Sequence, residues 1–267
     1  MVSRRDFLIG TGTLAAGLAL GSAAAPKAHA LGPILGTVLD YAAGVPSAQG
    51  IKNAGHLGVV RYVSDRRPGT ETWMLGKPLT ANEANAERAL GLGVASVYQF
   101  GKGDTADWKA GYQGGVTHAQ NAIRIHFAAG GPVNRPIYAA IDDNPTWAQY
   151  DQQIRPYLQG FNDTLRGSNL ILGVYGNFNV LNWAMNDGLG SYFWQHDWGS
   201  NSQIHERVTI HQKAGLATTI DGVTCDVNNV YAADWGQWNF VAQPVAPLFG
   251  GSSIPGIVLP PLPGSSL

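Results

Sequence analysis

Three polar residues follow an apolar run near the middle of the chain, and two of them could do chemistry together. Residues 137–141 have the length and composition of a buried strand, and Asp142, Asp143 and Asn144 follow directly. Because side chains alternate along a strand, Asp142 and Asn144 lie on one face and Asp143 lies on the other. A carboxylate here could act as an acid or a base. The segment therefore predicts a polar site at a strand end.

Helix capping accounts for the same residues in another way. Thr146 begins a helical pattern, and acids or asparagines just before a helix commonly accept hydrogen bonds from its free backbone amides. This segment alone does not separate the two interpretations, so the surrounding elements must do so.

Those elements alternate between short apolar runs and helical segments. Ser47 is placed to cap a helix, and Thr80 and Thr146 each begin a capping-box pattern that a Glu or Gln completes three residues later. Eight strands with about five helices predict an α/β barrel of the TIM type. The predicted strands are residues 34–39, 57–62, 94–99, 137–141, 170–175, 191–198, 207–212 and 222–227.

The helix after Thr146 shows apolar residues at spacings of three and four, which predicts one buried face and a kink at Pro156. The residues of this face are Trp147, Tyr150, Ile154, Leu158, Phe161 and Leu165.

The last three strands are connected differently. Residues 199–206 and 213–221 are too short and polar for packed crossover helices. Because a parallel pair requires a longer crossover, we expect strand seven to run antiparallel to its neighbours and strand eight to run parallel to the first five.

With that direction, three acids fall at the carboxyl ends of strands, where barrel enzymes carry their chemistry. They are Asp40, Asp142 and Asp226. Aromatic and amide side chains fall at or near the other strand ends, namely Tyr62, Gln99, Tyr175, Asn177, Trp194 and Trp198. Aromatic faces stack on sugar rings and planar amides bind hydroxyls, so this combination predicts a saccharide cleft. The alternative is that the aromatic residues simply fill the barrel.

Charge and cysteine content exclude several classes. Without residues 1–30 the chain has 14 basic and 17 acidic residues, a formal charge of about −3, which argues against nucleic acid as a partner. Cys225 is the only cysteine, so an intrachain disulfide and a cysteine-based metal cluster are impossible; we expect Cys225 to face out of the barrel as a packed thiol. His196 and Asp197 are adjacent and point to opposite faces of a strand, so we predict no metal site from them with His211, and no cofactor.

The two ends of the chain predict an exported protein. Arg4 and Arg5 precede a weakly hydrophobic run, and Ala28-His29-Ala30 matches a cleavage site, so we interpret residues 1–30 as a Tat signal peptide; a retained membrane anchor is the alternative. We expect a barrel domain over residues 31–241 with no membrane span in the mature form. The Pro-, Gly- and Ser-rich residues 242–267 predict a disordered or wall-spanning tail.

An ordered set of motifs between about residues 34 and 238 resembles an exported actinobacterial and mycobacterial family, domain of unknown function 1906, the glycoside-hydrolase-like domain. The motifs are Leu39-Asp40-Tyr41-Ala-x-Gly44, Gly58-Val-Val-Arg61-Tyr62, Lys77-x-Leu-Thr80-x-x-Glu83, Pro136-Ile-Tyr-Ala-Ala-Ile-Asp142 and Gly222-Val-Thr-Cys-Asp226-Val-Asn228. That family is similar to the family 25 lysozymes. The resemblance implies a flattened eight-strand barrel with five helices and a cleft for peptidoglycan or another N-acetylated wall glycan, with Asp40, Asp142 and Asp226 as carboxylates of the cleft.

This chain departs from the family 25 pattern at Asn144. Those lysozymes have their catalytic Glu at the corresponding position, two residues after the Asp, and an amide cannot donate a proton in acid catalysis. Two hypotheses remain. The chain is a non-catalytic or very weakly catalytic wall-glycan-binding protein on a hydrolase scaffold, or it is a lysozyme-like hydrolase that uses Asp142 with Asp40 or Asp226.

We predict that Asn144→Glu gives measurable cleavage of peptidoglycan fragments by a chain that otherwise cleaves them very weakly or not at all. General acid catalysis commonly contributes about 10²- to 10⁴-fold, so a turnover assay should resolve the gain. Robust turnover by the native chain that survives Asn144→Ala and is lost in Asp142→Asn would show that another group is the acid.

Overall fold

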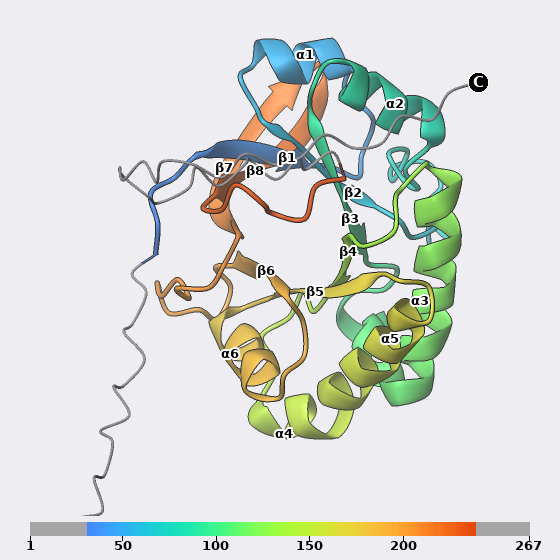
Figure 1. Cartoon of the computed structure of the whole chain (residues 1–267), viewed down its shortest axis with the longest axis vertical. Helices are drawn as coiled ribbons and strands as arrows, with labels where there is room; N and C mark the ends of the chain where they lie inside the picture. The colour runs from blue at the N-terminus through green and yellow to red at the C-terminus, as the bar shows by residue number, and fades with distance from the viewer. Residues whose placement is uncertain (1–30, 239–267) are drawn as a thin grey trace, which may run out of the picture.

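The computed structural model describes residues 31–238, which form a closed barrel of eight strands in the order β1 to β8 (Figure 1). The predicted signal peptide and the predicted tail lie outside the described residues. The prediction of an α/β barrel with eight strands and about five helices is confirmed. The strands are β1 (Gly36–Asp40), β2 (Gly58–Tyr62), β3 (Gly93–Tyr98), β4 (Pro136–Ala140), β5 (Ile171–Gly176), β6 (Tyr192–His196), β7 (Ile210–Ile220) and β8 (Val223–Val230).

The predicted directions of the last two strands are wrong. β7 is parallel to β6, and β8 is antiparallel to both β7 and β1. The connection between β6 and β7 contains no helix, yet it is long enough to return the chain to the other end of the barrel. β8 then follows β7 through a tight turn at Asp221 and Gly222, both with positive φ, and a tight turn can join only antiparallel strands.

Residues 213–221, predicted as a connection, mostly belong to β7. The strand continues to Ile220, with a register shift between Gln212 and Ala217, and it forms a hairpin with β8. The hairpin extends toward α1 (Figure 1), where Asp221 accepts a 2.8 Å hydrogen bond from the backbone amide of Ser47.

The helices follow strands β1 to β5 and pack outside the barrel (Figure 1). They are α1 (Ala48–Asn53), α2 (Ala81–Ala89), α3 (Gly111–Ala128), α4 (Trp147–Gln149), α5 (Arg155–Arg166) and α6 (Phe178–Asn186). Two short 3₁₀ turns, Gly103–Thr105 and Asp107–Ala110, precede α3. α4 and α5 form one continuous helical segment through a π turn, Tyr150–Ile154.

Two of the three predicted helix caps are found as expected. The Ser47 hydroxyl accepts a hydrogen bond from Gly50, and Thr146 forms a full capping box with Gln149. Thr80 caps α2 through the Glu83 amide, but the expected return bond is absent because the Glu83 carboxylate binds Arg61 instead.

Trp147 does not lie on the buried helix face where the sequence pattern placed it. The other five residues of the predicted buried face are fully buried, whereas 52% of Trp147 is exposed. The π turn adds a residue to one turn of this helix, so the face shifts and Trp147 no longer lies on it. Pro156 lies in the first turn of α5, directly after the π turn, where its missing N–H is tolerated.

Apolar side chains are buried in two layers. Alternate residues of the strands point outward beneath the helices, and Cys225 belongs to this outer layer, as predicted. The other face fills the barrel with Val38, Val60, Tyr138, Trp194 and their neighbours. Side chains alternate along a strand, so a residue two positions from one of these inner residues also points toward the barrel axis.

Arg61 is the most unusual residue of the outer layer, because its side chain is fully buried. Its guanidinium lies 2.5 Å from the Glu83 carboxylate and donates to the carbonyl oxygens of Tyr41 and Gly76, each at 2.5 Å. The Tyr41 ring packs against it at 3.9 Å. One side chain thus joins β2, the end of β1, the start of α2 and the loop before α2.

We predict that Glu83→Leu lowers the free energy of unfolding by about 3–5 kcal/mol, because it leaves a buried guanidinium without its counter-charge. The double variant Arg61→Met with Glu83→Leu should recover part of this loss. Urea denaturation of both variants measures the difference.

The exposed pair Arg124–Asp65, with side chains 62% and 47% exposed, is the matched control. Asp65→Leu should cost no more than about 1 kcal/mol, since surface ion pairs contribute little. A Glu83→Leu loss as small as the control would mean that the buried pair does not stabilise this wall of the barrel.

Candidate functional site

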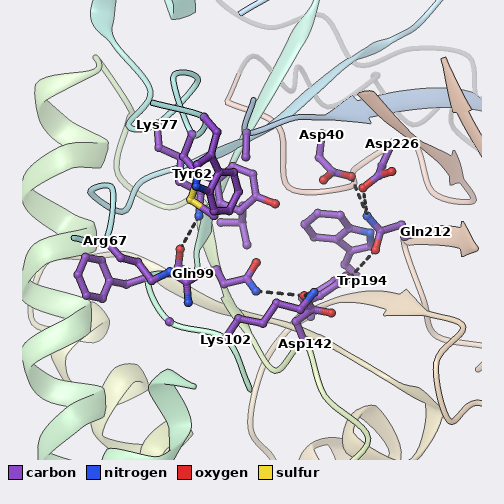
Figure 2. A pocket seen from close by; sticks show the side chains of 17 residues that line it. Asp40, Tyr62, Arg67, Lys77, Gln99, Lys102, Asp142, Trp194, Gln212 and Asp226 are labelled. Carbon is purple, nitrogen blue, oxygen red and sulfur yellow. Dashed lines mark hydrogen bonds and ion pairs between the residues drawn. The ribbon is translucent and has the colours of Figure 1, made fainter. Parts of the chain in front are cut away.

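A cavity of about 350 Å³ opens at the carboxyl ends of the parallel strands, and the three predicted acids line it (Figure 2). Asp40 ends β1 and Asp142 follows β4 by two residues, so each shares the inward parity of Val38 and Ala140 on its strand. Asp226 reaches the same rim for a different reason from the one expected. β8 runs antiparallel to β1, and its register places Asp226 directly opposite Asp40.

Asp40 and Asp226 share one hydrogen-bond donor. The Gln212 side-chain amide donates to Asp40 Oδ2 at 3.1 Å and to Asp226 Oδ2 at 3.3 Å. Asn228 donates a second bond to Asp40 Oδ2 at 2.8 Å and accepts one from the Trp194 indole, also at 2.8 Å. The two carboxyl groups are therefore neighbours held by fixed amides.

These contacts leave Asp40 in an unusual protonation state. Burial, and then the nearby charge of Asp226, raises the pKa of Asp40 from 3.8 to about 7, although the bonds from Asn228 and Gln212 oppose the shift. Burial and the charge of Asp142 also raise the pKa of Asp226. Asp40 thus keeps its proton to a much higher pH than an ordinary aspartate does.

Asp142 has a different environment. Its Oδ2 lies 2.6 Å from Lys102 Nζ and accepts a 3.1 Å hydrogen bond from Gln99 Nε2. Figure 2 shows these three side chains below the pair of Asp40 and Asp226. Asp142 is therefore arranged as an acceptor between a cation and an amide.

The structure brings most, but not all, of the other candidate residues to the cavity. Tyr62, Gln99, Tyr175 and Trp194 line it, and Tyr175 donates a hydrogen bond to Gln212. Trp198, which is 55% exposed, lines an adjoining hollow that also contains Asp142 and Asp226.

Asn177 and Asn144 do not line the cavity. Asn177 is buried, caps α6 through the Val180 amide and donates a 2.9 Å hydrogen bond to Asn144 Oδ1. Asn144 is exposed, and its side chain packs against Gly199. A Glu at this position must turn away from Asn177 to reach the cavity. Asn144→Glu therefore gives cleavage only if the new side chain both reaches the cavity and donates a proton there. Asp143 points elsewhere, as expected, and accepts a bond from the Trp108 indole.

Several lining residues were missed by the sequence analysis. Gln212 ends a predicted strand, so the strand-end argument used for Gln99 applies to it as well. Lys77 was recognised only as part of a family motif, and Arg67 and Lys102 lie in loops whose paths no local pattern reveals. Asn228 was recognised within a family motif, but its bond to Asp40 depends on the antiparallel register that we did not predict.

His196 and Asp197 point to opposite sides, as expected from their adjacency. His211 pairs with Asp197 at 2.6 Å, and Asp197 also accepts a bond from the Ala214 amide, so this pair ties β6 to β7. His196 is buried, its Nε2 lies 3.3 Å from the Ile141 carbonyl, and burial lowers its pKa. In the described part of the chain, neither histidine forms a hydrogen bond or an ion pair with Asp40, Asp142 or Asp226.

A closed α/β barrel with carboxylates, amides and aromatic rings around a cavity at its carboxyl rim has the architecture of a glycoside-hydrolase-like protein. Residues 49–230 match the model of the Rv2525c-like, glycoside hydrolase-like domain, and the chain belongs to this family.

Two comparisons with individual proteins agree. The chain is 48% identical over 247 residues to "Putative peptidoglycan hydrolase Rv2525c" of Mycobacterium tuberculosis, covering 89% of this chain and 99% of that protein. The crystal structure of the Tat-secreted M. tuberculosis protein Rv2525c in complex with HEPES has a TM-score of 0.72 at 50% identity, covering 76% of this chain and 98% of the other.

A more distant structure supports the fold only. The catalytic domain of endolysin ply40, from bacteriophage P40 of Listeria monocytogenes, has a TM-score of 0.50 at 15% identity, covering 73% of this chain and 92% of the other.

We predict that Asp40→Asn stabilises the protein more at pH 8 than at pH 5. The folded-state pKa lies above the unfolded one, so native Asp40 loses stability as the pH rises from about 4 through about 7, whereas Asn is neutral throughout. The difference between variant and wild type should grow by about 2–3 kcal/mol between these pH values, as measured by urea denaturation.

Asp104→Asn removes an exposed carboxyl outside the cavity and should show no such dependence on pH. A difference between Asp40→Asn and wild type that stays constant from pH 5 to pH 8 would show that Asp40 titrates normally.

Proposed function

We propose that this protein binds a cell-wall glycan in the cavity and cleaves it very slowly or not at all. The observation that carries the proposal is the lining itself. Aromatic rings, planar amides and carboxylates meet at one rim, and a saccharide offers ring faces and hydroxyls to such a set. The name of the M. tuberculosis relative supports peptidoglycan as the glycan.

Weak or absent hydrolysis follows from where the carboxyl groups lie. The position two residues after Asp142 holds an amide that bonds to Asn177 outside the cavity. Asp142 accepts from both Lys102 and Gln99, an arrangement suited to charge stabilisation rather than proton donation. The residues nearest to a family 25 pair therefore lack an evident proton donor.

One observation favours an active hydrolase as the second candidate. Burial and the charge of Asp226 raise the pKa of Asp40 to about 7, so Asp40 can carry a proton near neutral pH, as a general acid must. In that case Asp40 would supply the proton, and Asp226 or Asp142 would stabilise the positively charged transition state.

We also propose that the protein is exported by the Tat pathway, that residues 1–30 are removed, and that the barrel domain over residues 31–241 works at the cell wall. The twin arginines support this route, as does the Tat-secreted relative. Within residues 31–238, no helix combines the length and hydrophobicity needed to cross a bilayer.

We predict that Trp198→Ala and Tyr62→Ala each weaken binding of soluble peptidoglycan fragments by roughly three- to tenfold, because each removes a ring face beside the acids. Their melting temperatures should stay close to wild type. Isothermal titration calorimetry measures the affinity, and chromatography of the same samples after long incubation measures any cleavage.

Phe127→Ala is the matched control. Phe127 is 40% exposed near the end of α3, at the opposite end of the barrel from the cavity, and its loss should leave binding unchanged. Wild-type affinity in both cavity variants would place the glycan elsewhere, and rapid cleavage abolished by Asp40→Asn would establish the hydrolase instead.

A further inference from the structure

The cavity is divided by charge. Figure 2 shows Arg67 and Lys77 with Tyr62 on one side, and Asp40 with Asp226 and Gln212 on the other. The bonds agree with this view, since Lys77 packs over the Tyr62 ring at 3.9 Å whereas Gln212 bridges the two acids. The third cation, Lys102, pairs with Asp142.

Lys77 is a buried cation that forms no ion pair in the described residues, and the charges of Asp107 and Asp142 act on it only from a greater distance. Only 4% of the residue is exposed, and its ammonium donates a 2.8 Å hydrogen bond to the Gln99 carbonyl. Within residues 31–238, no carboxylate lies at ion-pair distance from it. Burial lowers its pKa to about 8, so it remains largely charged at neutral pH. Burying a charge without an ion-pair partner costs free energy, and a ligand of opposite charge can offset that cost.

Arg67 lies near Lys77 but is only partly buried. Arg67 lines both the cavity and a neighbouring hollow that Trp73 and Phe100 also line. Its Nη1 donates to the Thr105 hydroxyl at 3.3 Å, and in the described part of the chain it has no ion pair with an acid. A guanidinium and an ammonium that face one cavity form a natural site for an anion.

We propose that the Arg67 and Lys77 side of the cavity binds the free carboxylate of an acidic saccharide, whose hydroxyls face Gln212 and Asp226. This inference rests on the proposed glycan binding and names its substrate class. Asp40 and Asp226 at the other side repel the carboxylate, so they fix the direction in which the sugar ring enters.

The charges that line the cavity favour a ligand with one negative charge over a ligand with two. Arg67, Lys77 and Lys102 oppose Asp40, Asp142 and Asp226, and burial raises the pKa of Asp40 to about 7. The cavity is thus close to neutral or slightly positive, so a monoanionic carboxylate restores the balance. A dianionic phosphate would meet stronger repulsion from the acids.

The test compares two sugars that differ only in charge. The disaccharide of N-acetylglucosamine and N-acetylmuramic acid, with its lactyl carboxylate free, is titrated against its neutral carboxamide by calorimetry. The wild-type chain should bind the acid about tenfold more tightly, the range expected of a charge-assisted contact. Lys77→Met and Arg67→Gln should each remove most of this preference.

The control is Lys52→Met, which removes one positive charge on α1 outside the cavity and should keep the full preference. Arg67 is only partly buried, so Arg67→Gln remains informative if Lys77→Met fails to fold. Equal binding of the acid and the amide by wild type would overturn the inference while leaving glycan binding intact, and so would full preference in a folded Lys77→Met together with Arg67→Gln.

Glucuronate and glucuronamide, followed by NMR titration, separate the two proposals further. If neither disaccharide binds but glucuronate does, and Lys77→Met abolishes this, the carboxylate site stands and the proposed wall-glycan function fails. If none of the four sugars binds to the wild-type chain, both proposals are wrong.

Discussion

The geometry of the cavity depends on the buried guanidinium of Arg61. It bonds to the carbonyl of Tyr41, the residue after Asp40, and to the carbonyl of Gly76, the residue before Lys77. One acid and one base on opposite sides of the cavity are therefore positioned by the same side chain, which is held by Glu83. Because a planar guanidinium has five donors in fixed directions, it fixes the relative positions of these segments, which a lysine could not do. The glutamate that the sequence offered as a helix cap serves this purpose instead.

The barrel places its ionisable groups at unequal depths, and the depth determines their protonation. Asp40 is buried at the end of β1, and its pKa rises to about 7. Asp226 lies opposite on β8 and is more exposed, and partial burial together with the charge of Asp142 also raises its pKa. Lys77 is buried on the other side, so its pKa falls to about 8. Desolvation thus brings the pKa of Asp40 and the pKa of Lys77 toward the same range. In that range each group changes its charge readily when a ligand binds.

The sequence predicted the fold better than the site. The 2-residue and 3.6-residue periods revealed eight strands and five helices, because each element carries its own apolar pattern. Strand direction is not a local property, and the short connections misled us about β7 and β8. Asp226 was nevertheless placed correctly, since the antiparallel register brings it opposite Asp40. Lys77 and Arg67 lie in irregular loops, where the positions of side chains depend on tertiary contacts such as those of Arg61.

Asn144 belongs to the structure around the cavity and does not line the cavity itself. Its amide oxygen accepts from Asn177, which also caps α6, so residue 144 helps to fix the start of a helix instead of facing the substrate. An amide suits this place because it stays neutral beside Gly199 and Asn177 at every physiological pH. The capping interpretation is wrong in its detail, since Asn144 does not cap the helix that begins after Thr146 but bonds to Asn177, the cap of α6. Asp142 faces the cavity, and Asn144 belongs to the structure that supports it.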